Sequence, residues 1–483
     1  MRTFLIATAL AFCCGAPLQA REAAFTPTTV PPSGVIGVQD AYLSPEFWIA
    51  RLNGADAVVM SRAEIDAQNA RLMRVDKSMH DLAALPPTLD RAQVQAWLDH
   101  MSRRPDEPLF DVRGDALSAS AIDAFVANAD RDAVPEQQHT RYGLTVHRAA
   151  LRSFPTLERV FDERGDTDID RFQESALFPG TPVAIVHASR DGEWLFVVSP
   201  RYAAWVRKDA VAEGARDAVL DYAAAEPYRL VTAAKVRTVY TPEEPRVSEL
   251  QLDMGVRVPL VQVAGGTPVN GQQAYTSWPI RLPVRNADGS LSLATALLQK
   301  NADTTGAPLP LTRANIIRQA FKFLGERYGW GHDYNARDCS GFVSEVYRSM
   351  GVLMPRNTSD QGVSPAFDRI HFEKTDGADS RKAAVDQLQV GDLIYIPGHV
   401  MMMIGRIDGV PYVIHDTNGG SYLGADGNMH GMHLNGVSVT PLTPLRFNPQ
   451  QTYIDRITNI VRMRPIGHAA TPPDGRTATE ATP

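Results

Sequence analysis

The thiol of Cys339 is the strongest candidate for a chemical role in this chain, and it lies in the stretch RDCSGFV, residues 337–343. The 483-residue chain has only three cysteines, and the other two, Cys13 and Cys14, lie near the amino terminus. Asp338 has a side chain suited to cap a helix, which places Cys339 in the first helical turn. The free N–H groups of that turn favour an anion, so the pattern predicts a lowered thiol pKa and a nucleophile.

A nucleophilic thiol needs a base within hydrogen-bonding distance, and usually a third group that orients the base. Two apparent strands follow downstream, reading GHVMMMIG and GVPYVIHD. As neighbouring antiparallel strands, they bring His399, at the start of one, close to His415, at the end of the next. We therefore predict that His399 is the base for Cys339 and that His415 orients it. Asp416 and Asn418 remain alternatives for the third position.

Helices and strands together must position these residues. Thr312 is a suitable cap for a helix, and apolar side chains follow it at helical spacing: Ile316, Ile317, Ala320, Phe321 and Leu324. The helix that begins near Cys339 has its own apolar face and a stop signal at Gly351. With the strands downstream, these helices indicate an α+β domain over residues 306–466.

Upstream of this domain the pattern is typical of small β-barrels. Between residues 131 and 222, short runs of alternating apolar and polar residues are separated by turns. A second set of the same kind occupies residues 223–305. Runs of this length and spacing predict two successive barrels. The preceding segment, residues 21–130, has helical spacing and a capping box at Ser61 and Glu64, which predicts a helical accessory region.

The first 20 residues have the pattern of a secretory signal peptide. Arg2 is followed by the apolar run FLIATALA, and the small residue Ala20 stands at the expected cleavage site. The run is too short for a membrane-spanning helix, so we expect no transmembrane segment in the mature chain. Cleavage removes Cys13 and Cys14 and leaves one thiol, which in an exported protein indicates a functional role. The sequence LAFC, ending at Cys13, loosely resembles a lipidation box, so a lipid anchor remains an alternative.

These features predict an exported protein of the periplasm or cell envelope. The end of the chain, residues 467–483, is low in apolar residues, and we expect a disordered tail there. The formal net charge of −7, without a basic stripe, argues against nucleic-acid binding. One cysteine and widely separated histidines lack the paired spacing of structural zinc sites. Thiol–imidazole chemistry requires no metal or organic cofactor, and we expect none.

Separated motifs in a fixed order resemble the NlpC family of bacterial cell-wall cysteine peptidases. They are YGWG from Tyr328, DCSGFV from Asp338, GDL from Gly391, GHV from Gly398 and IH ending at His415. The resemblance covers about residues 310–465 and implies a papain-like α+β fold that acts on peptidoglycan-derived peptides. The two upstream barrels resemble the bacterial SH3-type modules of one subgroup. That subgroup cleaves the bond between γ-D-glutamate and the diamino acid.

The resemblance also implies roles for residues outside the predicted triad. Tyr328 would lie beside the thiol and help to stabilise the oxyanion. Asp338 would bind the free α-amine of an N-terminal L-Ala, and Ser340 would contact the same end of the peptide. Tyr202, in the first barrel, would close the pocket. Ser359 would lie near the carboxylate of the D-Glu residue.

The sequence departs from the family pattern at two places. His332 and Asp333 stand where small residues are commoner, and His415 is followed by Asp416 where Ala is expected. Two other functions therefore remain as alternatives. One is a related thiol amidase or acyltransferase on the same fold, and the other is a cell-wall-binding protein without catalytic activity.

Overall fold

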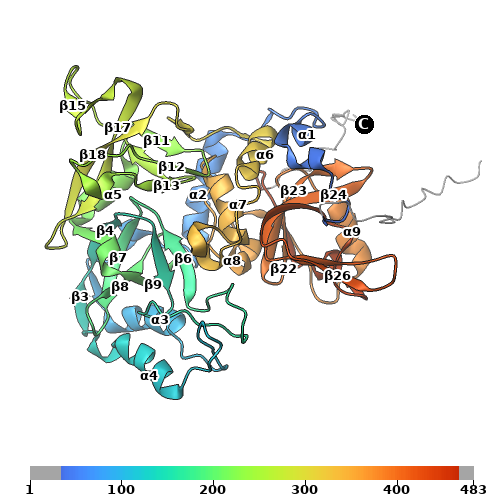
Figure 1. The fold of residues 1–483 in the computed structure, drawn as a ribbon, viewed down its shortest axis with the longest axis horizontal. Coiled ribbons are helices and arrows are strands. Elements are labelled where there is room, and N and C mark those ends of the chain that lie inside the picture. Colours follow the sequence, from blue (N-terminus) through green and yellow to red (C-terminus); the bar gives the residue numbers. More distant parts are fainter. Residues whose placement is uncertain (1–33, 467–483) are drawn as a thin grey trace, which may run out of the picture.

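A computed structural model describes residues 34–466 of the chain. The expected signal peptide, the candidate lipidation site at Cys13 and the expected tail over residues 467–483 lie outside this range. Between residues 34 and 466, no helix combines the length and apolar character that a membrane span requires. Figure 1 shows three sheet-containing regions in chain order, with the carboxy-terminal one drawn in orange and red.

The carboxy-terminal domain is built on an antiparallel sheet of six strands. Their spatial order is β21 (Asp368–His371), β30 (Asn459–Arg462), β22 (Leu393–Ile396), β23 (His399–Ile407), β24 (Val410–Thr417) and β27 (Gly436–Pro441). Two helices, α6 (Arg313–Phe321) and α7 (Cys339–Arg348), share a core with one face of this sheet. The other face packs on α9 (Ala378–Asp386) and on a smaller sheet of β25 (Gly420–Leu423), β26 (Met429–Met432), β28 (Leu445–Asn448) and β29 (Gln451–Thr452).

The side chains of β23 alternate between these two cores, as the period of a strand requires. Val400, Met402 and Ile404 pack toward α7, whereas Met401 and Met403 pack on the opposite side. A strand buried on both faces explains why the sequence reads as a continuous apolar run there.

The predicted caps at the starts of the two helices are confirmed, whereas α6 ends at Phe321, before the predicted Leu324. The Thr312 hydroxyl caps α6 by accepting a hydrogen bond from the Asn315 N–H, and the Asp338 carboxylate caps α7 in the same way. The apolar face of α7, from Phe342 to Tyr347, is fully buried. Capping and burial together fix the first turn of α7, and Cys339 with it, against the sheet.

The first predicted barrel region forms one antiparallel sheet of seven strands. The order is β10 (Val211–Gly214), β4 (Arg141–Thr145), β7 (Pro182–Ala188), β8 (Trp194–Val198), β9 (Ala203–Arg207), β5 (Ala149–Arg152) and β6 (Gln173–Leu177). The sheet curls around a core that includes Phe196 and Trp205. Its strand β6 faces the carboxy-terminal domain (Figure 1).

The second predicted barrel region is assembled differently, from short ladders and one long hairpin. The ladders are β11 (Tyr228–Val231) with β14 (Arg257–Pro259) and β19 (Thr304–Thr305), β12 (Lys235–Arg237) with β13 (Gln251–Asp253), and β15 (Pro268–Val269) with β16 (Gln272–Gln273). The hairpin joins β17 (Ser277–Arg285) to β18 (Leu291–Gln299). One apolar core, with Val231, Leu252 and Ile280, unites these pieces.

The helices before the barrels bury their apolar faces on the neighbouring domains. Helix α1 (Pro45–Ile49) packs on α6, and its Trp48 lies against Gly405 of β23. Helix α2 (Arg62–Val75) begins with the predicted capping box, which is confirmed. Helix α3 (Arg91–Met101) shares its core with the first barrel, and α4 (Ala119–Asn128) lies beside it (Figure 1). The amphipathic helices are too small to make a core, so each buries its apolar face on a neighbouring sheet.

Candidate active site

Cys339 is the first residue of α7, and its thiol faces the beginning of β23. The side chain is 5% exposed, and the sulfur lies 4.0 Å from the carbonyl oxygen of Gly398. Gly398 immediately precedes His399, so the thiol lies beside the segment that carries the imidazole. The helix and the sheet thus bring Cys339 into contact with Gly398, the residue before His399 and 59 positions away in the sequence.

A chain of side-chain hydrogen bonds leads away from His399. Its Nε2 atom lies 2.8 Å from Nδ1 of His415, and Nε2 of His415 lies 3.0 Å from Oγ1 of Thr440. The three residues stand on β23, β24 and β27, which are consecutive neighbours in the sheet. His415 and Thr440 are buried, whereas His399 is only partly buried.

The sequence singled out Asp416 and Asn418 as alternatives to His415. Asn418 is exposed, and its carbonyl oxygen accepts a hydrogen bond from the Asn435 N–H. Asp416 is fully buried, but neither of its carboxylate oxygens has a hydrogen-bond partner among the described residues. The hydrogen-bonded partner of His399 is therefore His415.

The predicted lowering of the thiol pKa is wrong for this structure. Burial raises the pKa of Cys339 to about 12, and the negative charge of Asp338 adds to the rise. Burial also lowers the pKa of His399 to about 4. The helix start contributes partial positive charge, but loss of water around the sulfur outweighs it. The resting pair is accordingly a neutral thiol and a neutral imidazole.

The Asp338 carboxylate is saturated with hydrogen-bond donors. Its Oδ1 accepts from the Gly341 N–H at 2.8 Å, and from the Ser340 hydroxyl and Arg356 Nη1, each at 3.1 Å. Its Oδ2 accepts from Arg356 Nη2 at 2.7 Å and from the Gly331 N–H at 3.1 Å. Five protein donors thus occupy the roughly four lone-pair positions of the Asp338 carboxylate in this structure.

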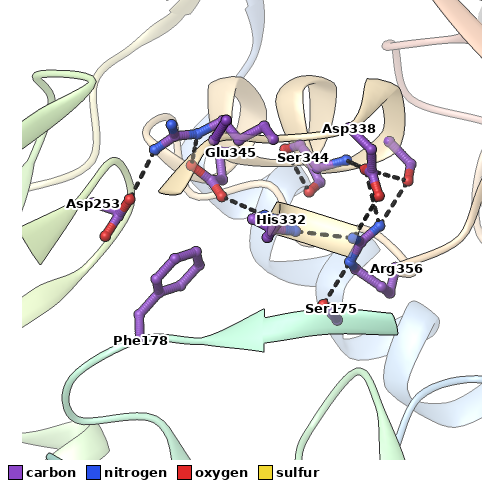
Figure 2. Close-up of polar contacts among 12 residues, drawn as sticks. Ser175, Phe178, Asp253, His332, Asp338, Ser344, Glu345 and Arg356 are labelled. Carbon is purple, nitrogen blue, oxygen red and sulfur yellow. Dashed lines mark hydrogen bonds and ion pairs between the residues drawn. The ribbon is translucent and has the colours of Figure 1, made fainter. Parts of the chain in front are cut away.

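A buried network continues from Asp338 to the second barrel region (Figure 2). Arg356 donates from Nη2 to Nδ1 of His332 at 2.9 Å, and Nε2 of His332 lies 2.9 Å from Oε1 of Glu345. Arg337 donates to Glu345 at 2.5 Å and to Asp253 at 3.0 Å. Because arginine only donates, His332 accepts at Nδ1 and donates from Nε2, which makes it neutral.

The neutral state of His332 agrees with its surroundings. Burial and the nearby Arg356 hold the His332 pKa well below its usual value. Gly341 permits this arrangement, because a Cβ atom there would lie 2.5 Å from the imidazole ring. His332, the departure from the family pattern noted in the sequence, therefore links the nucleophile helix to Arg356.

The first barrel contributes to the same region through strand β6. Arg356 donates from Nε to the Ser175 hydroxyl at 2.7 Å, and the Gln173 amide donates to the Gly331 carbonyl at 2.7 Å. Beside them, the Tyr202 hydroxyl donates to the Glu174 carboxylate at 2.6 Å. Burial raises the pKa of Glu174, and its hydrogen bond from Tyr202 opposes this rise.

The remaining candidates differ in where they lie. Tyr328 is buried near the thiol, and burial followed by the charge of Cys339 raises the pKa of its hydroxyl. Ser340 is buried between Asp338 and Arg356, from which it accepts a hydrogen bond at 2.8 Å. Ser359 is exposed on α8 (Thr358–Val363) and makes none of the contacts that join this cluster.

Sequence reasoning did not identify Glu174 or Thr440 as site residues. Glu174 lies in a strand of another module, 165 positions before Cys339, and Thr440 lies in a strand with no recognisable motif. No local sequence pattern identifies Glu174 or Thr440, because each reaches the site region only through the packing of strands distant in the sequence. Only a fold-level alignment of strands would have indicated them.

Two family models match the chain. Residues 155–207 match an SH3 domain of the SH3b1 type, and residues 325–444 match the NlpC/P60 family. In a solved structure, an NlpC/P60 endopeptidase from Photobacterium damselae subsp. piscicida has the same fold. The TM-score is 0.69 at 17% sequence identity, over 88% of this chain and 96% of that one.

Curated relatives match over shorter regions. Dipeptidyl-peptidase 6 of Lysinibacillus sphaericus is 28% identical over 23% of this chain and 34% of its own length. A γ-D-glutamyl-L-lysine dipeptidyl-peptidase of Bacillus cereus is 28% identical over 36% of this chain and 50% of its own length. The chain thus matches half or less of the length of these two relatives. It carries a domain of the NlpC/P60 family, which contains the Cys339 and His399 cluster, preceded by an SH3 domain of the SH3b1 type.

Proposed function

We propose that the protein is a cysteine peptidase that hydrolyses the γ-D-glutamyl–diamino acid bond of peptidoglycan-derived peptides. The observation that supports it most is the thiol of Cys339 at a helix start, beside the segment that leads into the His399–His415–Thr440 hydrogen-bond chain. A helix-borne nucleophile with a base and an orienting group is the arrangement that acyl transfer requires. The names of the relatives support the choice of bond.

In this proposal the reaction begins from the neutral pair. Nε2 of His399 is engaged by His415, so Nδ1 of His399 receives the thiol proton as the sulfur attacks the γ-carbonyl carbon. The imidazolium then gives its proton to the leaving amine, and a thioester to Cys339 remains. Water activated by the same nitrogen hydrolyses the thioester and regenerates the thiol.

Two groups are placed to stabilise the oxyanion of the tetrahedral intermediate. The backbone N–H of Cys339 points out from the first turn of α7, where no earlier residue of the helix accepts it. Tyr328 lies buried near the same sulfur. Its raised hydroxyl pKa keeps it protonated, and therefore a donor, throughout the physiological range.

The free amine of the peptide is assigned to Glu174 and Tyr202 rather than to Asp338. All acceptor positions of Asp338 are taken by protein donors, whereas Glu174 accepts one hydrogen bond from Tyr202. A partly buried carboxylate on the first barrel selects a peptide with an N-terminal ammonium group, as in L-Ala-γ-D-Glu-diamino acid. Asp338 and Arg356 then act by fixing the floor of this subsite.

The decisive test is mass spectrometry of products from L-Ala-γ-D-Glu-L-Lys and from the corresponding diaminopimelate peptide. We expect release of the diamino acid, no release by Cys339→Ala, and strongly reduced release from N-acetylated peptide. Glu174→Gln should raise KM for the free peptide at least tenfold and leave the N-acetylated peptide unaffected. Absence of cleavage of any of these peptides by a folded wild-type protein would refute the peptidase proposal.

The same assay separates the alternatives. An amidase or acyltransferase would leave the peptides intact and turn over acyl esters or amides. A wall-binding protein without activity would bind sacculi equally well after Cys339→Ala. We further propose export to the periplasm or cell envelope, where such peptides arise, and fractionation of cells expressing the full chain tests this location.

A further inference from the structure

A cavity of about 600 Å³ lies behind the catalytic helix, between the first barrel, the second barrel region and α2. Its walls include Ser344 and Arg348 of α7, on the opposite side of the helix from its apolar face. None of the residues Cys339, His399 and His415 lines it. The cavity is therefore a space separate from the nucleophile, and of a size that accommodates a small organic molecule.

Two guanidinium groups in this cavity have no anionic partner. Arg201 lies in the turn between β8 and β9, and its hydrogen bond goes to the neutral Ser344 hydroxyl at 3.2 Å. Arg348 ends α7, and its side-chain stem packs on Gly255 of the second barrel region. Neither guanidinium lies within ion-pair distance of a carboxylate in the described part of the chain. Glu345 attracts both arginines from farther away, as do Asp338 for Arg201 and Asp253 for Arg348.

The other charged groups in the walls are already compensated or lie at the surface. Arg356 is paired with Asp338 at 2.7 Å, and Arg257 is paired with Glu226 at 2.7 Å. Arg62 donates to the carbonyl oxygen of Met350 at 2.9 Å. Asp66 is the sole carboxylate among the lining residues, and it is exposed on α2. Among the arginines away from the surface of this cavity, Arg201 and Arg348 are thus the ones without a carboxylate at ion-pair distance.

Two neighbouring guanidinium groups without an adjacent anion are electrostatically unfavourable when no ligand is bound. Burial, together with the positive charges of Arg348 and Arg356, lowers the pKa of Arg201 to about 9, against the attraction of Glu345 and Asp338. Burial also lowers the pKa of Arg348. Both arginines are half-buried, and a half-buried cation without an adjacent counter-ion loses part of its hydration. An anion bound between the two guanidinium groups would offset that loss and reduce their mutual repulsion. Guanidinium groups are well suited to carboxylate and phosphate oxygens.

The apolar side chains that line the rest of the cavity indicate that the ligand also has an apolar part. Apolar side chains surround the two arginines: Met73, Met79, Phe178, Tyr222, Leu230 and Met354. An inorganic ion would leave these surfaces in contact with water. An apolar group attached to the anion would bury these side chains, which the hydrophobic effect favours.

We propose that this cavity binds a small organic anion, with one carboxylate or phosphate group between Arg201 and Arg348 and an apolar body against the surrounding side chains. The site uses none of the reacting groups, although Tyr202 and Arg356 of the proposed amine subsite also line the cavity. Its ligand contacts α7 from behind and joins the first barrel to the catalytic domain through Arg201.

Isothermal titration calorimetry on the full chain at 0.15 M NaCl tests this site with four probes. They are phenyl phosphate, 3-phenylpropionate, the uncharged 3-phenylpropanamide and inorganic phosphate. We expect saturable binding of at least one of the two aromatic anions, with at least tenfold weaker binding of the amide and of inorganic phosphate. Comparison of phenyl phosphate with 3-phenylpropionate decides between a phosphate and a carboxylate ligand.

Variants locate the binding. Arg201→Gln and Arg348→Gln should each weaken it at least tenfold, whereas Arg257→Gln, which removes an already paired arginine from the same wall, should change it less than threefold. Arg348→Met should abolish binding yet raise the melting temperature of the ligand-free protein, because it removes an uncompensated charge. Binding that survives both Gln substitutions, no binding of either aromatic anion, or equal binding of inorganic phosphate would overturn the proposal.

Discussion

The Nε2 atom of His399 lies 2.8 Å from the Nδ1 atom of His415, across the neighbouring strands β23 and β24. This contact fixes the orientation of the His399 ring and directs its other nitrogen away from His415. It makes His415 the positioning residue of the proposed mechanism, and it connects the site to the buried Thr440.

Substitutions of the two histidines should separate base from orienting group. We expect His399→Ala to lower kcat by about 10³ or more, within the range of general-base effects, with little change in KM. His415→Ala should lower kcat about 10²-fold, and His415→Asn less, because an amide oxygen still accepts from His399. Steady-state kinetics on the free tripeptide measures these effects. Equal loss in the Ala and Asn variants would contradict an orienting role.

Thr440 should matter through the tautomer of His415. When Nε2 of His399 donates to His415, Nε2 of His415 donates to the Thr440 hydroxyl. Thr440→Val removes this acceptor without changing volume, and we expect kcat to fall about tenfold, the value of one hydrogen bond. Thr440→Ser keeps the acceptor and should retain activity. A Val variant with wild-type kcat would show that the tautomer is set elsewhere.

The pH dependence should reflect a neutral resting pair. The His399 pKa of about 4 means that the base is neutral above that pH, so kcat/KM should fall only as the pH drops through about 4. The Cys339 pKa of about 12 predicts that the rate of alkylation by iodoacetamide rises continuously to pH 10. A plateau in the alkylation rate below pH 7 would instead reveal a thiolate–imidazolium pair.

Asp416 should limit stability at high pH. Burial raises the pKa of its carboxyl well above the usual value, and neither oxygen has a hydrogen-bond partner among residues 34–466. A raised carboxyl pKa gives stability that is present at low pH and lost as the pH rises. Asp416→Asn should therefore gain stability relative to wild type from pH 5 to pH 9. Urea unfolding at both pH values measures this, and a constant difference would argue against the buried acid.

His332 provides a test of the buried network between Arg356 and Glu345. His332→Leu leaves both partners unsatisfied and should lower the free energy of unfolding by about 3 kcal/mol. The glutamine amide in His332→Gln can accept a hydrogen bond from Arg356 and donate one to Glu345. The free energy of unfolding should therefore fall much less than in His332→Leu.

Comparing wild type with His332→Gln at two pH values also tests the lowered pKa of the His332 imidazole in the folded protein. Because the folded-state pKa of His332 is lowered, its contribution to stability is present above its unfolded value of about 6.5 and is lost as the pH falls. Wild type should therefore lose more stability than His332→Gln between pH 7 and pH 5. Parallel loss in the two proteins would mean that His332 is not neutral in the fold.

Short-range patterns in the amino-acid sequence specify the local features of the site. The cap at Asp338, the helix that begins at Cys339 and the strands that begin at His399 and end near His415 follow from short-range patterns of capping, apolar spacing and alternation. Strand neighbours joined by a tight turn also fixed the proximity of the two histidines. These features depend on interactions between residues close in the chain.

Features that depend on burial and on contacts between modules come from the tertiary structure. It raised the thiol pKa, which the helix start alone would have lowered, because packing removed water from Cys339. Tertiary packing also pairs the Asp338 carboxylate with Arg356, and it places Glu174 of the first barrel in the site region, where Tyr202 donates to it. Desolvation and long-range ion pairing depend on the whole packed molecule, and no local pattern of residues specifies them.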